Sequence, residues 1–181
     1  MKIIESSETH YYQNLKSGIH EYGNDWFDIY NVNTYYTLQY KGLQTAILPI
    51  VDEAYVLMVK VKRELIGLST WELPAGGVSK NEAPVQAAQR ELKEETGVSI
   101  EDYDRFLDQP SLIVSPNRMP MYPLLFKVNI TRTEFDARNH HDHEIEEVAL
   151  FSFSEVKRMI ANDEIIVLLP LAVISRYLLS L

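Results

Sequence analysis

The sequence predicts one α/β domain, and three observations carry this prediction. Segments rich in β-branched and aromatic residues lie on both sides of one long helical segment, residues 84–96. Two further segments of helical composition follow later in the chain. Of the 181 residues, 46% are hydrophobic, which suffices for one core. This order of segments is typical of an α/β/α sandwich with a mixed β-sheet.

The acidic composition restricts the class of partner. The net charge of −9 argues against a nucleic-acid backbone, so an anionic substrate must meet local cationic groups or metal ions. The absence of cysteine excludes disulfides, thiolate metal sites and cysteine nucleophiles. The sequence has no apolar run of about 18 residues and no basic-then-apolar signal, so we expect a cytoplasmic protein without a membrane partner.

Residues 1–33 are predicted to be an N-terminal extension that contributes to a dimer contact. Within them, residues 7–16 favour a short helix, and Gly23 begins a turn. Trp26 follows this turn and has two interpretations. Its ring is suited to stacking on a nucleobase, and the alternative is packing in a core or a dimer interface.

The main domain is predicted to span residues 34–181 and to begin with three strands. Residues 35–40, 45–51 and 55–61 are rich in β-branched and aromatic side chains. The turn sequence Asp52-Glu53 separates the last two segments, so we expect them to form a hairpin.

Residues 84–96 are predicted to form a helix because most of them are strong helix formers. Pro84 suits the first helical position, where a missing N–H costs nothing. Gly97 suits the left-handed residue that commonly follows a helix. An alternative start, with Ser79 and Glu82 as a capping box, would place Pro84 inside the helix.

Three carboxylates share one face of this predicted helix. Glu91, Glu94 and Glu95 stand at positions i, i+3 and i+4, within an arc of about 100°. Like charges at this spacing repel, and a divalent cation such as magnesium, manganese or calcium would relieve the repulsion. The alternative is a solvated acidic face with Arg90 and Lys93 as neighbours.

The chain after residue 98 alternates strands, turns and helices. We expect strands at residues 106–107, 112–114, 120–130 and 145–153, with a turn at 115–117 and a polar loop at 131–143. Ser154 is expected to cap a helix over residues 155–161. Pro170 is expected to open a last helix, with an apolar stripe of Leu171, Ile174, Leu178 and Leu181.

The histidine-rich part of the polar loop, residues 139–144, has two interpretations. It contains three histidines, an aspartate and a glutamate, which are metal-ligating residue types. Ligands so close in sequence converge on one ion only if the backbone turns back, so an ordinary loop is the alternative.

Nine residues around the helix reproduce a family motif. The Nudix box reads Gly-x5-Glu-x7-Arg-Glu-aliphatic-x-Glu-Glu-x-Gly-aliphatic, and this chain resembles the Nudix hydrolase family at every defined position. The resemblance implies the Nudix fold and hydrolysis of a nucleoside diphosphate linked to another group. The matching residues are Gly76, Glu82, Arg90, Glu91, Leu92, Glu94, Glu95, Gly97 and Val98.

The resemblance also implies a metal site and catalytic roles. The Ala75 carbonyl and the three helix carboxylates, Glu91, Glu94 and Glu95, would hold Mg²⁺, with Mn²⁺ as a substitute. Arg90 would orient a neighbouring carboxylate by hydrogen bonding, and Glu82 would support the loop. The general base would be Glu144 or Glu146 from the polar loop, or Glu94 itself.

The segment before the box indicates the substrate. Glu72-Leu73-Pro74-Ala75-Gly76 is similar to the ADP-ribose and nucleotide-sugar pyrophosphatases. Arg63 stands nine residues before Glu72, the spacing of a phosphate-binding arginine in those enzymes, although a solvated strand end is the alternative. Pro116 belongs to a Ser-Pro pair that is also typical of this group, with Asn117 in place of the usual glycine.

The leading prediction is therefore hydrolysis of ADP-ribose to AMP and ribose 5-phosphate by a homodimer, with another nucleotide sugar as the close alternative. Two rival interpretations belong to other classes. One is a Nudix-fold binding or regulatory module without catalysis, and the other is an acidic structural helix that binds calcium.

Overall fold

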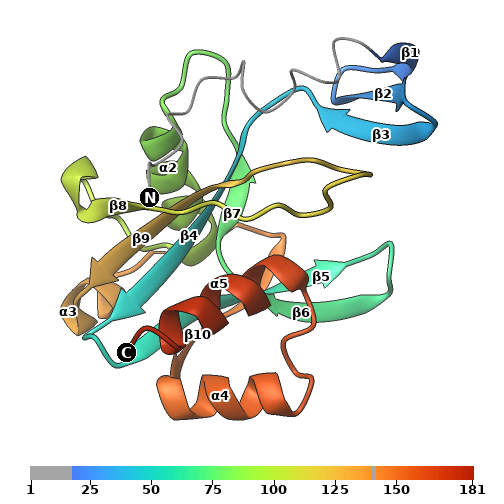
Figure 1. The fold of residues 1–181 in the computed structure, drawn as a ribbon. Helices are drawn as coiled ribbons and strands as arrows, with labels where there is room; N and C mark the ends of the chain where they lie inside the picture. Colours follow the sequence, from blue (N-terminus) through green and yellow to red (C-terminus); the bar gives the residue numbers. More distant parts are fainter. Residues whose placement is uncertain (1–17, 140–141) are drawn as a thin grey trace.

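The computed structural model describes residues 18–139 and 142–181 (Figure 1). The predicted helix over residues 7–16 lies outside them. None of the described helices combines the length and the apolar character needed to cross a membrane. The strands are β1 (Ile19–Gly23), β2 (Phe27–Val32), β3 (Tyr35–Tyr40), β4 (Gln44–Val51), β5 (Tyr55–Arg63), β6 (Leu68–Glu72), β7 (Ala75–Gly77), β8 (Phe106–Gln109), β9 (Leu124–Ile130) and β10 (Ile145–Ser152). The helices are α2 (Pro84–Thr96), η2 (Tyr103–Arg105), α3 (Arg132–Asp136), α4 (Phe153–Ala161) and α5 (Leu168–Leu178).

A seven-stranded mixed sheet forms the centre of the molecule. Its order is β10-β5-β4-β9-β8, with β6 added to β5 and β7 added to β4. β4 and β9 run parallel, and the other pairs are antiparallel. The predicted hairpin forms, since Val51 pairs with Tyr55. The mixed sheet and its helices confirm the predicted α/β class.

Both faces of the sheet are covered, which explains the continuous apolar run in β4. Ala46, Leu48 and Ile50 face a core cluster with α4 and α5. Ile47 and Val51 face a second cluster with α2 and α3. Since successive residues of a strand point to opposite faces, this alternation produces the predicted α/β/α sandwich.

The N-terminal strands form a separate sheet in the order β1-β2-β3, which stands apart from the central sheet (Figure 1). β3 pairs along its whole length with β2. The predicted boundary between residues 33 and 34 therefore falls in the turn that joins these two strands. This sheet is hydrogen-bonded to the turn at residues 115–119. Leu38 N donates to Arg118 O at 2.8 Å, and Thr37 Oγ1 donates to Asn117 O at 3.1 Å.

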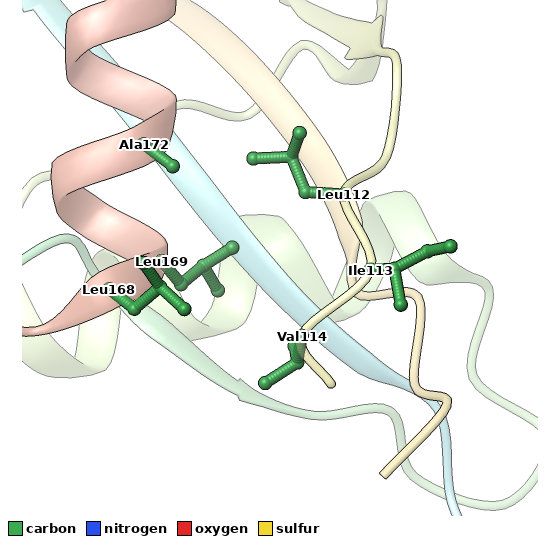
Figure 2. A pocket seen from close by; sticks show the side chains of 6 residues that line it. All are labelled: Leu112, Ile113, Val114, Leu168, Leu169 and Ala172. Atoms are coloured by element: carbon green, nitrogen blue, oxygen red, sulfur yellow. The ribbon is translucent and has the colours of Figure 1, made fainter. Parts of the chain in front are cut away.

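Residues 112–114 differ from the prediction, since they form no strand. They instead line one side of an apolar pocket of about 150 Å³ beside α5, and the Leu112 side chain points toward the helix (Figure 2). Leucine, isoleucine and valine are common both in strands and in loops that pack on a helix. The composition of residues 112–114 therefore predicted a strand where the structure has a loop. The pocket offers no side-chain polar group for a phosphate. Its lining residues are Leu112, Ile113, Val114, Leu168, Leu169 and Ala172.

One α-helix was not predicted, and two predicted helices begin elsewhere. The polar loop contains α3, which begins at a capping box between Thr131 and Glu134. α4 is capped by Ser152, two residues earlier than predicted, because Glu155 completes a capping box with it. α5 begins at Leu168, so Pro170 lies inside its first turn, where its missing N–H has no partner to lose.

Candidate active site

The predicted helix α2 forms as expected. Pro84 is its first residue, and Ala83 N donates to Gln86 Oε1 at 2.9 Å just before it. Gly97 ends it in the left-handed conformation with φ of 76°. The alternative start is wrong, since Ser79 N donates to Glu82 Oε2 in the preceding turn and not at the helix start.

The three carboxylates of α2 occupy different environments. Glu91 is buried, Glu94 is half exposed, and Glu95 accepts a hydrogen bond from Ala75 N at 3.1 Å. Burial raises the pKa of Glu91 and raises the pKa of Glu95 to about 8. The interpretation as a solvated acidic face is therefore wrong for Glu91 and Glu95. It holds only in part for Glu94, whose side chain is half exposed.

Gly76 allows the loop to approach the helix. A Cβ atom at this position would overlap the Glu91 carboxylate, whereas a Cβ at Gly77 would meet its nearest neighbour, Gln44 Nε2, at 3.7 Å. The first glycine is thus required by contact with Glu91, and the second is not. The loop and the carboxylates of α2 are thereby held side by side.

Arg90 connects the loop to the carboxylates. Its Nε and Nη2 donate to Glu82 at 2.9 and 3.1 Å, and Nη2 also donates to Gly77 O at 2.8 Å. Its Nη1 donates to Glu91 at 2.7 Å and to Glu94 at 3.0 Å. These bonds, chiefly those to Glu82, raise the pKa of the guanidinium. Arg90 therefore remains charged and orients the acidic side chains around it.

A second ion pair lies across β5 and β6. Arg63 Nε and Nη2 donate to the two oxygens of Glu72, each at 2.8 Å, and Thr70 Oγ1 donates to the same carboxylate at 2.6 Å. Glu72 is buried, whereas half of the Arg63 side chain is exposed. The interpretation of Arg63 as a simple solvated strand end is thus wrong, because its two hydrogen bonds to Glu72 fix the orientation of the guanidinium.

The two halves of the site lie close enough to interact electrostatically. The negative charges of Glu95 and Glu144 both help to raise the pKa of Arg63, after its hydrogen bond to Glu72. Glu144 follows the loop and lies just before β10. Glu146 occupies an irregularity in the pairing of β10 with β5 and is exposed. The structure therefore pairs Arg63 with Glu72 and places it within electrostatic range of Glu95 and Glu144.

The comparisons with known proteins agree with this geometry. The family model described as the NUDIX domain matches residues 41–169. The chain belongs to the Nudix family. This result confirms the resemblance and the Nudix fold, and residues 76–98 are its Nudix box.

Individual relatives match only part of this Nudix protein. An ADP-ribose pyrophosphatase of Bacillus subtilis is 44% identical over 52 residues, 29% of this chain and 28% of the relative. An RNA pyrophosphohydrolase of Bartonella henselae is 50% identical over 46 residues, 25% of this chain and 27% of the relative. Another, from Mesorhizobium japonicum, is 61% identical over 28 residues, 16% of each chain. The alignments thus span about a quarter or less of these relatives.

Two predicted substrate contacts lie elsewhere in the fold. Pro116 belongs to the turn from Ser115 to Met119, which accepts hydrogen bonds from Thr37 and Leu38 of β3. Trp26 lies between β1 and β2 and is 71% exposed, so the interpretation as a core residue of this chain is wrong. Neither residue has a hydrogen bond to α2 among the described residues.

The donor set of the Nudix box suits a hard cation. Glu91, Glu94, Glu95 and the Ala75 carbonyl offer oxygen ligands, as magnesium prefers. Glu91 and Glu95 are held against Gly76 and Ala75, respectively. Within residues 18–139 and 142–181, no three Asp, Glu or His side chains converge as a preformed metal site. His140 and His141 of the suggested second metal site lie outside these ranges.

Two contacts of the site were not predicted from the sequence. The Thr70 hydroxyl bonds to Glu72, and the Gly77 carbonyl accepts from Arg90. A threonine in a strand is ordinary, and a backbone carbonyl leaves no signal in composition. Only the pairing of β5 with β6 and the fold of the loop bring these groups into place.

Proposed function

We propose that this protein is a magnesium-dependent Nudix hydrolase that cleaves the diphosphate bond of a nucleoside diphosphate linked to another group. The observation that carries the proposal is the grouping of three α2 carboxylates with the Arg63–Glu72 pair and Glu144. Oxygen ligands for a cation, a guanidinium for a phosphate and a carboxylate for a proton are what this hydrolysis requires.

Each group has an assigned task. The carbonyl of Ala75 and the carboxylates of Glu91, Glu94 and Glu95 would hold magnesium, with Arg90 orienting the carboxylates. Magnesium, when bound, supplies charge neutralisation on the phosphoryl oxygens and lowers the pKa of a coordinated water. Arg90 itself has no N–H group left to bind the substrate, because its donors are engaged by Gly77, Glu82, Glu91 and Glu94.

The remaining steps belong to side chains across the site. Glu72 engages Nε and Nη2 of Arg63, and we assign Nη1 to a substrate phosphate. Glu144 accepts the proton of the attacking water, with Glu146 and Glu94 as the alternative bases. The oxygen of water forms a bond to one phosphorus atom of the diphosphate, and the bond from that phosphorus to the bridging oxygen breaks. The bridging oxygen keeps the electron pair and leaves as part of the departing phosphate.

ADP-ribose is the substrate that we favour, with AMP and ribose 5-phosphate as products. The sequence ahead of the Nudix box, the oriented Arg63 and the relative named ADP-ribose pyrophosphatase all support it. Another nucleotide sugar is the close alternative. Two relatives are named RNA pyrophosphohydrolases, but the net charge of −9 disfavours binding to an RNA backbone.

Phosphate release tests this proposal directly. The protein is incubated with magnesium and ADP-ribose, other nucleotide sugars, dinucleoside polyphosphates, nucleoside triphosphates or 5′-triphosphorylated RNA. Alkaline phosphatase reports the products of the substrates that have no terminal phosphate, and chromatography reports those of the triphosphates and the RNA. We expect turnover of ADP-ribose that Glu94→Gln lowers by about 100-fold or more. Glu101→Gln, an exposed carboxylate outside the box, is the matched control. Turnover of RNA alone would reassign the substrate.

The rival is a Nudix-fold binding module without catalysis. All acidic positions of the box are occupied here, which favours the enzyme. A folded protein that binds ADP-ribose with magnesium but turns over no member of the panel would establish the rival.

We also propose that the N-terminal sheet contributes to a homodimer and that Trp26 binds the nucleobase. Trp26, Tyr22 and Tyr36 are each more than half exposed in one chain, and exposed aromatic groups are typical of interfaces. Light scattering and the KM of Trp26→Ala separate the two roles. A dimer with a raised KM supports nucleobase binding, whereas loss of the dimer assigns Trp26 to the interface.

A further inference from the structure

The C-terminal end of α2 is bonded to the loop that carries Glu144. Asn139 N donates to Gly97 O at 3.0 Å, and Asp142 N donates to Glu94 O at 2.8 Å. Carbonyl groups in the last turn of a helix lack intrahelical partners, so they readily accept such donors. Two backbone bonds thus join the helix of the metal-ligand residues to the loop.

Gly97 is required for this contact as well as for the helix end. Its φ of 76° is the left-handed conformation, and its N–H donates to Lys93 O at 2.9 Å. A Cβ atom on Gly97 would also overlap the carbonyl group of Asn139. The missing side chain therefore lets the loop lie directly on the helix end.

The contact continues to the proposed general base. Ile145 N donates to Asp142 O at 3.2 Å, so Glu144 lies within a short turn that closes just before β10. One end of this turn is bonded to Glu94 O of α2, and the other end enters the central sheet. The distance between Glu144 and the α2 carboxylates is consequently set by backbone atoms at both ends.

We propose that Gly97 is a positioning residue that sets Glu144 relative to the carboxylates of α2. The proposal rests on the proposed function, in which Glu144 accepts the proton of the attacking water. A side chain at position 97 would displace the loop and the base, while the metal ligands on α2 would remain in place. The chemical step would then slow without loss of substrate affinity.

Gly97→Asn tests the role with little backbone strain. Asparagine tolerates the left-handed conformation, yet its Cβ still meets Asn139. Gly67→Asn is the matched control, because Gly67 has φ of 66° and no atom of the described residues lies within 4 Å of an added Cβ. We expect kcat to fall about 10- to 100-fold in Gly97→Asn with KM within about twofold, and little change in the control.

A double-mutant cycle separates positioning from general loss of structure. If Gly97→Asn acts by displacing the base, the double variant with Glu144→Gln should be no slower than Glu144→Gln alone. If the two substitutions multiply their effects on kcat, Gly97 does not act through Glu144 and the proposal fails. A folded Gly97→Asn variant with unchanged kcat also overturns it.

Amide hydrogen exchange provides a readout independent of activity. The amides of Asn139 and Asp142 should be protected in the wild type and exchange faster in Gly97→Asn, but not in Gly67→Asn. Unprotected amides in the wild type would overturn the proposal even if Gly97→Asn fails to fold. If the wild type hydrolyses no substrate, the proposed function fails and the positioning role with it. Turnover with additive mutational effects instead removes only the positioning role.

Discussion

Arg63, the last residue of β5, and Glu72, the last residue of β6, form a bidentate ion pair, with both N–O distances at 2.8 Å. The Glu72 side chain is 9% exposed and the Arg63 side chain 50% exposed. The buried carboxylate of Glu72 is therefore neutralised by a guanidinium that solvent can reach. Two parallel hydrogen bonds fix the orientation of that guanidinium.

Removal of Arg63 should destabilise the protein through Glu72. Arg63→Ala leaves a buried carboxylate that still accepts a hydrogen bond from the Thr70 hydroxyl. We expect the free energy of unfolding to fall by about 1–3 kcal/mol in urea titrations at neutral pH. Arg132→Ala is the control, because the Arg132–Asp136 pair is more than half exposed on both sides. That change should be within about 0.5 kcal/mol, and equal losses would contradict the prediction.

Gly76→Ala should disrupt the carboxylates that we propose as metal ligands. An added Cβ overlaps the Glu91 carboxylate, so Glu91 or the loop must shift. We expect kcat/KM to fall about 100-fold, measured as magnesium-dependent phosphate release from whichever substrate the panel described above identifies. Gly77→Ala places its Cβ 3.7 Å from Gln44 Nε2, an ordinary contact, and should have a much smaller effect. A larger loss in Gly77→Ala would show that the contact with Glu91 is not decisive.

Arg90→Lys should weaken the site although it preserves the charge. A lysine lacks the planar group that reaches Glu82, Glu91 and the Gly77 carbonyl together. We expect the free energy of unfolding to fall by about 1–3 kcal/mol and kcat to fall by about 10-fold or more. Arg158→Lys, in an exposed pair with Glu164, is the control and should be nearly neutral.

The Arg105–Glu134 pair should make stability depend on acid pH. Hydrogen bonding from Arg105 lowers the pKa of Glu134 from 4.5 to about 2. Because the pKa is lowered on folding, the stabilisation is fully present above pH 4.5 and is lost as the pH falls through 2. With about a third of the Glu134 side chain exposed, we expect Glu134→Gln to cost about 1 kcal/mol at neutral pH.

Urea titrations across this pH range provide the measurement. The difference in unfolding free energy between wild type and Glu134→Gln should shrink between pH 4.5 and pH 2. A difference that stays constant over this range would show that ionised Glu134 is not the stabilising group.

The sequence alone determined the elements whose signal is local. The helix formers between Pro84 and Gly97 predicted both ends of α2, because caps and intrahelical bonds involve near neighbours. The helical period also placed Glu91 and Glu95 on one face. The same local rules assigned β4 and β5, whose apolar residues need only a sheet to be buried.

Only the tertiary structure decided how these elements meet. Pairing of β5 with β6 joined Arg63 to Glu72, and packing of the later loop on α2 joined Asn139 to Gly97. Residues 112–114 had the composition of a strand and instead packed against α5. Contacts between distant segments depend on burial and on backbone pairing across the whole domain. The sequence pattern of a single segment predicts neither of them.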